Sequence, residues 1–186
     1  MKNILIIFIV FSCSLANAQF NKGTVFLKDS TELNGLIRIK TFGGIKFKTT
    51  KDSESTFYDY KTITGFDTED GKYRYIKYQD GFSPRLLKEN IKGKISLYSN
   101  EVYNPGHTIP NGFAGGGMGM AFGGGSATIY FILVEGKLQR VGTRLKKKHL
   151  KILENCKSLT EKIKKKNFKK RDVYEIINYY NNRCDW

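Results

Sequence analysis

Two apolar helical stripes near the end of the chain each carry a cysteine, and they restrict the fold of this region more than any other feature. At about 100° per residue, one face of a first helix gathers Leu145, His149, Ile152, Leu153 and Cys156. A later helix gathers Val173, Ile176, Ile177, Tyr180 and Cys184. If these faces pack together and the cysteines pair, the closed loop stabilises the fold by roughly 3–4 kcal/mol.

A disulfide needs an oxidising compartment, and the start of the chain predicts export to one. Met1–Ala18 has a basic Lys2, an apolar run and a small-x-small end at Ala16–Ala18, which together predict a signal peptide. Lipoprotein processing at Cys13 is the alternative, but the bulky Phe11 fits it poorly. We therefore expect a Cys156–Cys184 disulfide in a periplasmic, outer-membrane-peripheral or secreted protein.

The positive charge of the chain is concentrated in one segment. Residues 137–172 carry fifteen Lys and Arg against three acidic residues, out of a formal net charge of +15 for the whole chain. We expect this segment to dock on an anionic surface, and a solvated helical face is the alternative interpretation. The expected binding residues are Lys146, Lys147, Lys148, Lys151, Lys164, Lys165, Lys166, Lys169, Lys170 and Arg171.

The chain before this segment has the pattern of an antiparallel β domain. Apolar and basic residues alternate in Gly35–Lys40 and again in 45–48, and Asp70-Gly71 is a strong hairpin signal. We expect an α+β protein with an antiparallel meander, either a curled sheet or a partly closed barrel, followed by two to three short helices. The expected domains are a signal peptide (1–18), a β domain (19–136) and a basic helical tail (137–186).

A glycine-rich stretch, Gly112–Gly125, has two interpretations. As a loop, it leads into Ala127–Val134, whose two apolar faces predict a buried central strand. As a membrane segment, residues 113–134 contain no charge, and Gly115, Gly119 and Gly123 repeat the spacing of closely packed membrane helices. Glycine costs a helix about 1 kcal/mol per residue relative to alanine, which favours the loop.

The sequence contains no recognisable catalytic or metal-binding pattern. His149 lies on an apolar face, where a packed histidine is expected, and no serine or free cysteine has a nucleophile context. No cysteine and histidine spacing suits zinc, and no Lys-Ser/Thr follows the glycines as in a phosphate-binding loop. We expect a protein that is not an enzyme and binds no cofactor.

Short motifs along the chain resemble small exported cell-envelope proteins of Bacteroidota. The resemblance rests on the signal end Ala16–Gln19, on Ile63-Thr64-Gly65-Phe66 before a tyrosine-rich hairpin, on Gly93–Tyr98, and on the tail from Asn155 to Asn181. It implies a β domain followed by a helical tail, and it brings no assigned activity to carry over to this chain. The glycine-rich stretch departs from this pattern.

These observations together predict an exported, non-enzymatic envelope protein with a binding or structural role. The expected partner is an anionic envelope surface such as lipid headgroups, lipopolysaccharide or acidic glycan, and export argues against nucleic acid. An integral membrane protein with a glycine-zipper span at 113–134 is the alternative.

Overall fold

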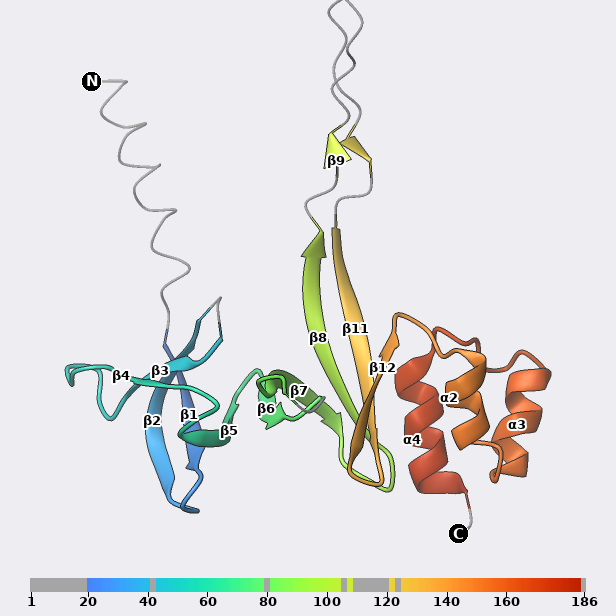
Figure 1. Ribbon diagram of the computed structural model, residues 1–186, viewed down its shortest axis with the longest axis horizontal. Helices are drawn as coiled ribbons and strands as arrows, with labels where there is room; N and C mark the ends of the chain where they lie inside the picture. Colours follow the sequence, from blue (N-terminus) through green and yellow to red (C-terminus); the bar gives the residue numbers. More distant parts are fainter. Residues whose placement is uncertain are drawn as a thin grey trace, which may run out of the picture. The chain divides into compact units, whose positions relative to one another are not determined.

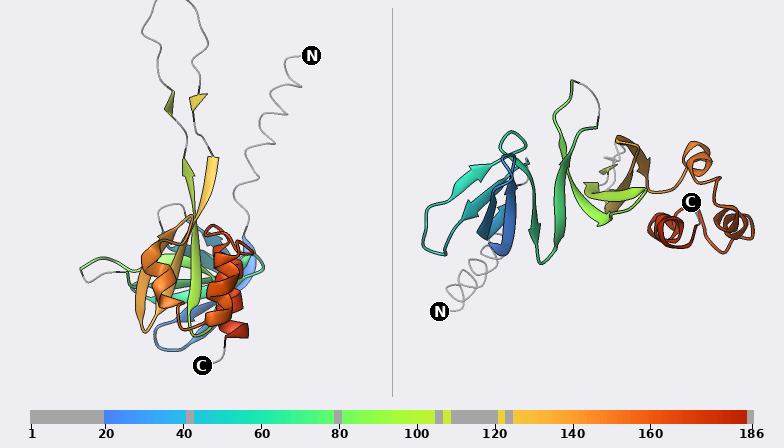
Figure 2. Two further views of the ribbon diagram at one scale, coloured as in Figure 1. Left: turned by 90° about the vertical axis from the view of Figure 1, so that its right-hand side faces the viewer. Right: turned by 90° about the horizontal axis from the view of Figure 1, so that it is seen from below.

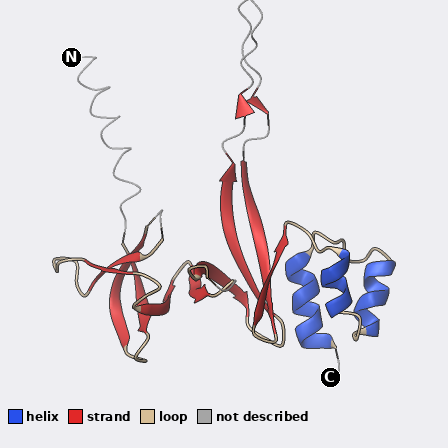
Figure 3. Cartoon of the chain, viewed as in Figure 1, coloured by secondary structure: helices blue, strands red, loops and turns tan. Residues whose placement is uncertain are grey.

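The computed structural model describes residues 20–40, 43–78, 81–104, 107–108, 121–122 and 125–184. Within these residues, ten strands form an antiparallel sheet that stays open, and three helices follow at the C-terminal end (Figures 1 and 3). The expected α+β class, an antiparallel sheet followed by a short helical tail, is confirmed. The chain divides into two compact units: Met1–Ile76 with Ser83–Leu86, and Lys77–Phe82 with Leu87–Trp186.

The first unit holds six of the described strands, in the spatial order β6-β5-β1-β2-β3-β4. The hairpin expected at Asp70-Gly71 is confirmed, with Thr68 paired to Gly71 across the turn. The bounds of the strands are β1 (Asn21–Leu27), β2 (Glu32–Ile39), β3 (Ile45–Lys48), β4 (Thr56–Tyr58), β5 (Ile63–Thr68) and β6 (Gly71–Ile76).

Alternate side chains of these strands form the core of the first unit. The fully or nearly buried members are Val25, Ile37, Ile45, Phe47, Ile63 and Phe66. Phe66 stacks on Tyr73 with ring centroids 5.0 Å apart. Gly35 allows the close approach of two strands, because a Cβ atom there would collide with the Lys48 carbonyl and the Phe47 ring.

The second unit holds the remaining strands. β11 lies between β8 and the edge strand β12, and β7 pairs with the other side of β8. Glu135 and Gly136, with φ of 48° and 74°, form the two-residue turn that joins β11 to β12, as a type I′ hairpin requires. The bounds are β7 (Arg85–Ile91), β8 (Ser96–Asn104), β9 (His107–Thr108), β10 (Ala121–Phe122), β11 (Gly125–Val134) and β12 (Lys137–Gly142).

Three short helices complete the second unit: α2 (Lys147–Ile152), α3 (Lys157–Lys164) and α4 (Val173–Arg183). Figure 1 and the right-hand view in Figure 2 show them side by side. The Ser-x-x-Glu pattern of Ser158 and Glu161 predicts a capping box at the start of α3, and the structure shows that this prediction is wrong. The N-cap is Cys156, whose carbonyl accepts a hydrogen bond from the Thr160 amide at 3.0 Å.

The residues of the two predicted stripes form most of the core of the second unit. The first stripe does not lie on a single helix as expected, because Leu145, Leu153 and Cys156 fall outside α2. Leu145, Leu153, Val173, Ile176 and Ile177 are each at most 2 % exposed. They pack with Ile95, Leu97 and Ile132 of the sheet in one cluster. The cysteines at the ends of the stripes, Cys156 and Cys184, form the expected disulfide, with Cα atoms 5.5 Å apart.

The strand interpretation of Ala127–Val134 is confirmed, because Gly125–Val134 is strand β11, paired with β8 and β12. The expected full burial of both faces is wrong: only Phe131 and Ile132 are buried, and the first three residues are exposed. No helix in the described parts of the chain has the length and apolar character needed to cross a membrane. The predicted signal peptide, Cys13 and most of Gly112–Gly125 lie outside the described residues.

Candidate anion-binding site

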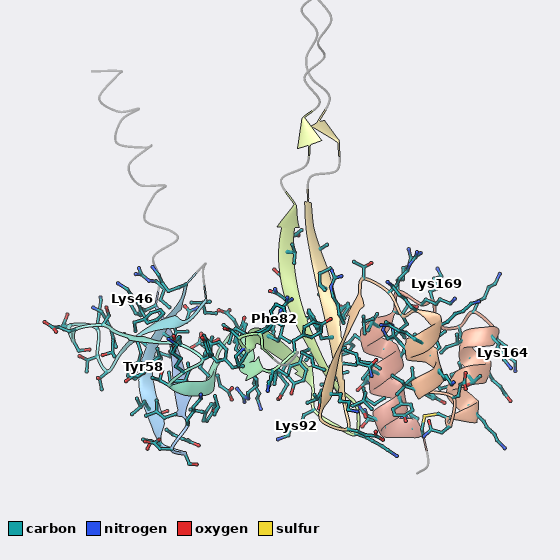
Figure 4. All side chains as sticks on the ribbon, viewed as in Figure 1. Lys46, Tyr58, Phe82, Lys92, Lys164 and Lys169 are labelled. Carbon is teal, nitrogen blue, oxygen red and sulfur yellow. A yellow bond between two sulfur atoms is a disulfide. The ribbon has the colours of Figure 1, made fainter. Side chains whose placement is uncertain are left out.

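All ten basic residues expected to bind an anionic surface are exposed. Four of them begin or lie within α2, opposite the buried stripe, and the other six end α3 or connect it to α4. Figure 4 shows Lys164 on the outer side of α3 and Lys169 near the start of α4, both projecting outward. The structure therefore presents the predicted residues to solvent on two separate stretches of chain.

A backbone hydrogen bond joins these two stretches. The Leu145 amide donates to the Lys170 carbonyl at 2.7 Å. This contact holds the segment that leads into α2 beside the segment that leads into α4. Lys146 and Arg171 follow directly on the two sides of the contact, so their positive charges belong to one region of the surface.

The group of three helices that carries these cations is bonded to the sheet through one residue of α4. The Asn181 side chain donates to the Ile95 carbonyl at 2.8 Å and accepts from the Ile95 amide at 3.1 Å. The Tyr180 hydroxyl bonds to Asn155 at 3.1 Å, beside the disulfide. The helices that carry the basic residues are thus held in place by the disulfide and by hydrogen bonds in which no basic side chain takes part.

A groove of about 610 Å³ runs along edge strand β12 and the turn that follows it. Four basic residues line it, and no acidic residue does. Two of the four, Arg140 and Arg144, are absent from the predicted binding residues. The full lining is Tyr78, Ile129, Leu138, Gln139, Arg140, Val141, Gly142, Thr143, Arg144, Lys146 and Lys148.

Gly142 shapes this groove at the end of β12. Its φ of 83° lies in the left-handed region, which favours glycine and ends the strand in a turn. The turn brings Arg144 to the same groove as Arg140, four residues earlier. The sequence signal that could have located Arg140 was the two-residue turn Glu135-Gly136, after which the chain pairs with β11 as another strand.

None of the basic side chains of residues 137–172 forms an ion pair with an acidic residue that the structure describes. Lys162 lies over the Tyr179 ring, 5.5 Å from its centroid. The charges at the groove are therefore not neutralised by those described acids, which is the electrostatic condition for attracting an anion.

His149 is completely buried beneath this surface, as the sequence predicted for a packed histidine. Its Nδ1 accepts a hydrogen bond from the Lys146 amide at 3.0 Å, and its Nε2 has no partner among the described residues. Burial lowers the pKa of His149, and the charges of Lys148 and Lys146 lower it further, while the Arg140 backbone acts in the opposite direction. The ring is thus neutral at pH 7 and adds no charge to the groove.

Another groove, of about 750 Å³, lies on the first unit. Its charged lining residues are of both signs: Lys22 and Lys51 with Asp67 and Glu69. Mixed charge gives this groove no comparable attraction for an anion. The described residues also contain no group of three His, Cys, Asp or Glu side chains placed to hold a metal ion.

Comparison of the chain with protein-family models, with curated proteins and with solved structures finds no match.

Proposed function

We propose that this protein is an exported, non-enzymatic component of the cell envelope whose basic tail docks on an anionic surface. The observation that carries the proposal is the set of exposed basic side chains of residues 137–172, which lack described acidic partners. Attraction between such cations and an anionic lipid surface contributes about 1 kcal/mol per basic residue near the surface.

The disulfide supports the exported part of the proposal. A Cys156–Cys184 bond persists in an oxidising compartment and is reduced in a bacterial cytosol. The resemblance to Bacteroidota envelope proteins suggests the same compartment, at the periphery of a membrane or free in the periplasm or medium. Both observations support a location in which the basic surface meets envelope lipid or glycan.

A vesicle sedimentation assay tests the docking. One variant replaces Lys146, Lys147, Lys148, Lys164, Lys165 and Lys166 with Gln. A matched control makes the same change at six exposed lysines of the first unit: Lys22, Lys28, Lys40, Lys51, Lys61 and Lys72. We expect only the first variant to lose most of its binding to anionic vesicles. Equal losses from both variants would mean that vesicle binding depends only on the net charge of the protein, and would contradict a docking role of the tail.

Washing native membranes tests the same proposal in cells. We expect high salt to release the protein, because screening weakens contacts between surface charges. Retention through both high salt and alkaline carbonate would instead support a lipid-embedded segment or a lipidated Cys13. Recovery of the protein in the soluble fraction before any wash would contradict docking.

A further inference from the structure

The groove beside β12 combines a cationic rim with an apolar floor. Arg140, Arg144, Lys146 and Lys148 supply the rim, and all four side chains are exposed. Leu138 and Val141, which are 7 % and 2 % exposed, supply part of the floor. This arrangement differs from that of the loop lysines Lys164–Lys166, which line none of the grooves described above.

Two features of the groove restrict the ligand. Four positive charges without an acidic lining residue favour a group that carries more than one negative charge. Guanidinium groups bind phosphate oxygens in pairs, and two of the four cations are arginines. A terminal phosphate monoester carries up to two charges and has three free oxygens, whereas a phosphodiester carries one charge and has two.

The size of the groove indicates that the ligand is larger than a phosphate ion. A volume of about 610 Å³ lies within the range of small-molecule sites, and its wall includes the half-buried Tyr78 and Ile129. Tyr78 contacts Phe131 edge to face, with ring centroids 6.2 Å apart, which fixes one wall of the site. An organic body attached to the phosphate therefore has an apolar surface to contact.

We propose that this groove selects the phosphate monoester of a lipid headgroup, so that the tail recognises one headgroup chemistry in addition to negative charge. The inference rests on the proposed docking function and assigns specificity to Arg140 and Arg144. The loop lysines then add affinity that does not depend on headgroup chemistry. The lipid source follows from the docking surface, because the groove includes Lys146 and Lys148 of the docking residues. The hydrogen bond from Leu145 to Lys170 also joins this segment to the chain that carries the other docking cations.

The experiment compares two pairs of substitutions that each remove two positive charges from the full, oxidised protein. Arg140→Gln with Arg144→Gln alters the groove, and Lys164→Gln with Lys165→Gln alters the loop. Binding is measured to phosphatidylcholine vesicles containing phosphatidic acid, a monoester, or phosphatidylglycerol, a diester, at matched surface potential. All four residues are exposed, and thermal unfolding of each variant checks that the fold is retained.

We expect the unsubstituted protein to prefer phosphatidic acid by about tenfold, the ratio that one charge-assisted hydrogen bond supplies. The groove variant loses this preference, and the loop variant binds both vesicles more weakly while keeping the preference. Equal effects of the two variants on the preference overturn the assignment to the groove but leave electrostatic docking intact. Failure of the unsubstituted protein to bind either vesicle overturns the proposed function as well.

A competition arm separates the lipid source from a soluble one. We expect glycerol 3-phosphate to displace the protein from phosphatidic acid vesicles only at concentrations well above that of the lipid. The reason is that the loop lysines bind the vesicle surface independently of the groove. If glycerol 3-phosphate binds in a manner that depends on Arg140 and Arg144 while phosphatidic acid vesicles give no preference, the ligand is a soluble phosphate ester and the lipid assignment is overturned.

Discussion

In the first unit, several basic side chains are bound to other parts of the protein. The tail of the second unit leaves all of its basic side chains except Lys162 facing solvent. Arg74 pairs with Asp67 at 2.6 Å and lies over the Phe26 ring. Arg38 and Lys48 both lie over the Phe20 ring, 5.0 and 5.6 Å from its centroid. No ion pair of this kind is found among the described residues of the tail.

The counts of basic and acidic residues in the two regions differ in the same way. Residues 20–76 carry ten basic and eight acidic residues, whereas residues 137–172 carry fifteen and three. Acidic residues therefore nearly balance the basic residues in 20–76, whereas the tail keeps a large excess of basic residues. The tail is stabilised by its apolar stripes and its disulfide, and its surface charges lack acidic partners among the described residues.

The largest expected effect comes from the core of the first unit. Phe66→Ala removes a fully buried ring that stacks on Tyr73, and we expect the free energy of unfolding to fall by about 3–5 kcal/mol. Amide hydrogen exchange resolved by peptide should show the loss in residues 20–76. An equal loss of protection in α2–α4 would show that the cores of the two units are not stabilised by different interactions.

The disulfide supplies the matching test for the tail. Replacing Cys156 and Cys184 together with Ser opens a loop with a sequence separation of 28, and we expect a loss of roughly 3–4 kcal/mol in unfolding free energy. Amide exchange should increase in α3 and α4, while peptides around Phe66 stay protected. If the tail is equally stable without the disulfide, the disulfide is not one of the two features that stabilise it, and only the apolar stripes remain.

A smaller effect is expected from the close approach of strands at Gly35. Gly35→Ala places a Cβ atom against the Lys48 carbonyl, so β2 and β3 must separate, at a cost of about 1–3 kcal/mol. Chemical denaturation measures the loss. Gly136→Ala is a useful contrast, because that glycine has free space around it and only its φ of 74° opposes the change.

The smallest effect concerns the pH dependence of the tail. Because the folded protein lowers the pKa of His149 below its ordinary value of 6.5, the unfolded chain takes up the proton first. Stability from this group is complete above pH 6.5 and decreases as the pH falls toward the folded pKa. Thermal unfolding between pH 7.5 and 5 should show this decrease, and His149→Asn, which keeps an acceptor for the Lys146 amide, should remove it.

Periodicity in the sequence was sufficient to predict the tail stripes and most strands of the first unit. Apolar spacing identified Val173, Ile176 and Ile177 as core residues because burial on one helix face imposes that spacing. β7 was not predicted, because Arg85–Ile91 does not alternate and takes its strand form from pairing with β8. Pairing across a sheet is a long-range interaction that a local pattern does not contain.

The candidate site was predicted only in part, for a related reason. The exposed lysines of α2 follow directly from their positions opposite the buried stripe, and those that end or follow α3 from the density of charge in their two runs. Arg140 was missed because residues 137–142 were assigned to the helical tail, while in the structure they form β12. Arg144 was missed because its position depends on the turn at Gly142, which only the three-dimensional structure places beside the groove.

The disulfide encloses the most lysine-rich part of the chain, and this has a consequence for proteolysis. The exposed runs Lys164–Lys166 and Lys169–Arg171 are sites where a trypsin-like protease cleaves, and both lie between Cys156 and Cys184. A cut at either run produces two fragments that stay covalently linked through the sulfur atoms. A nicked molecule outside the cell thus retains α4, with its anchor at Asn181, beside the rest of the tail.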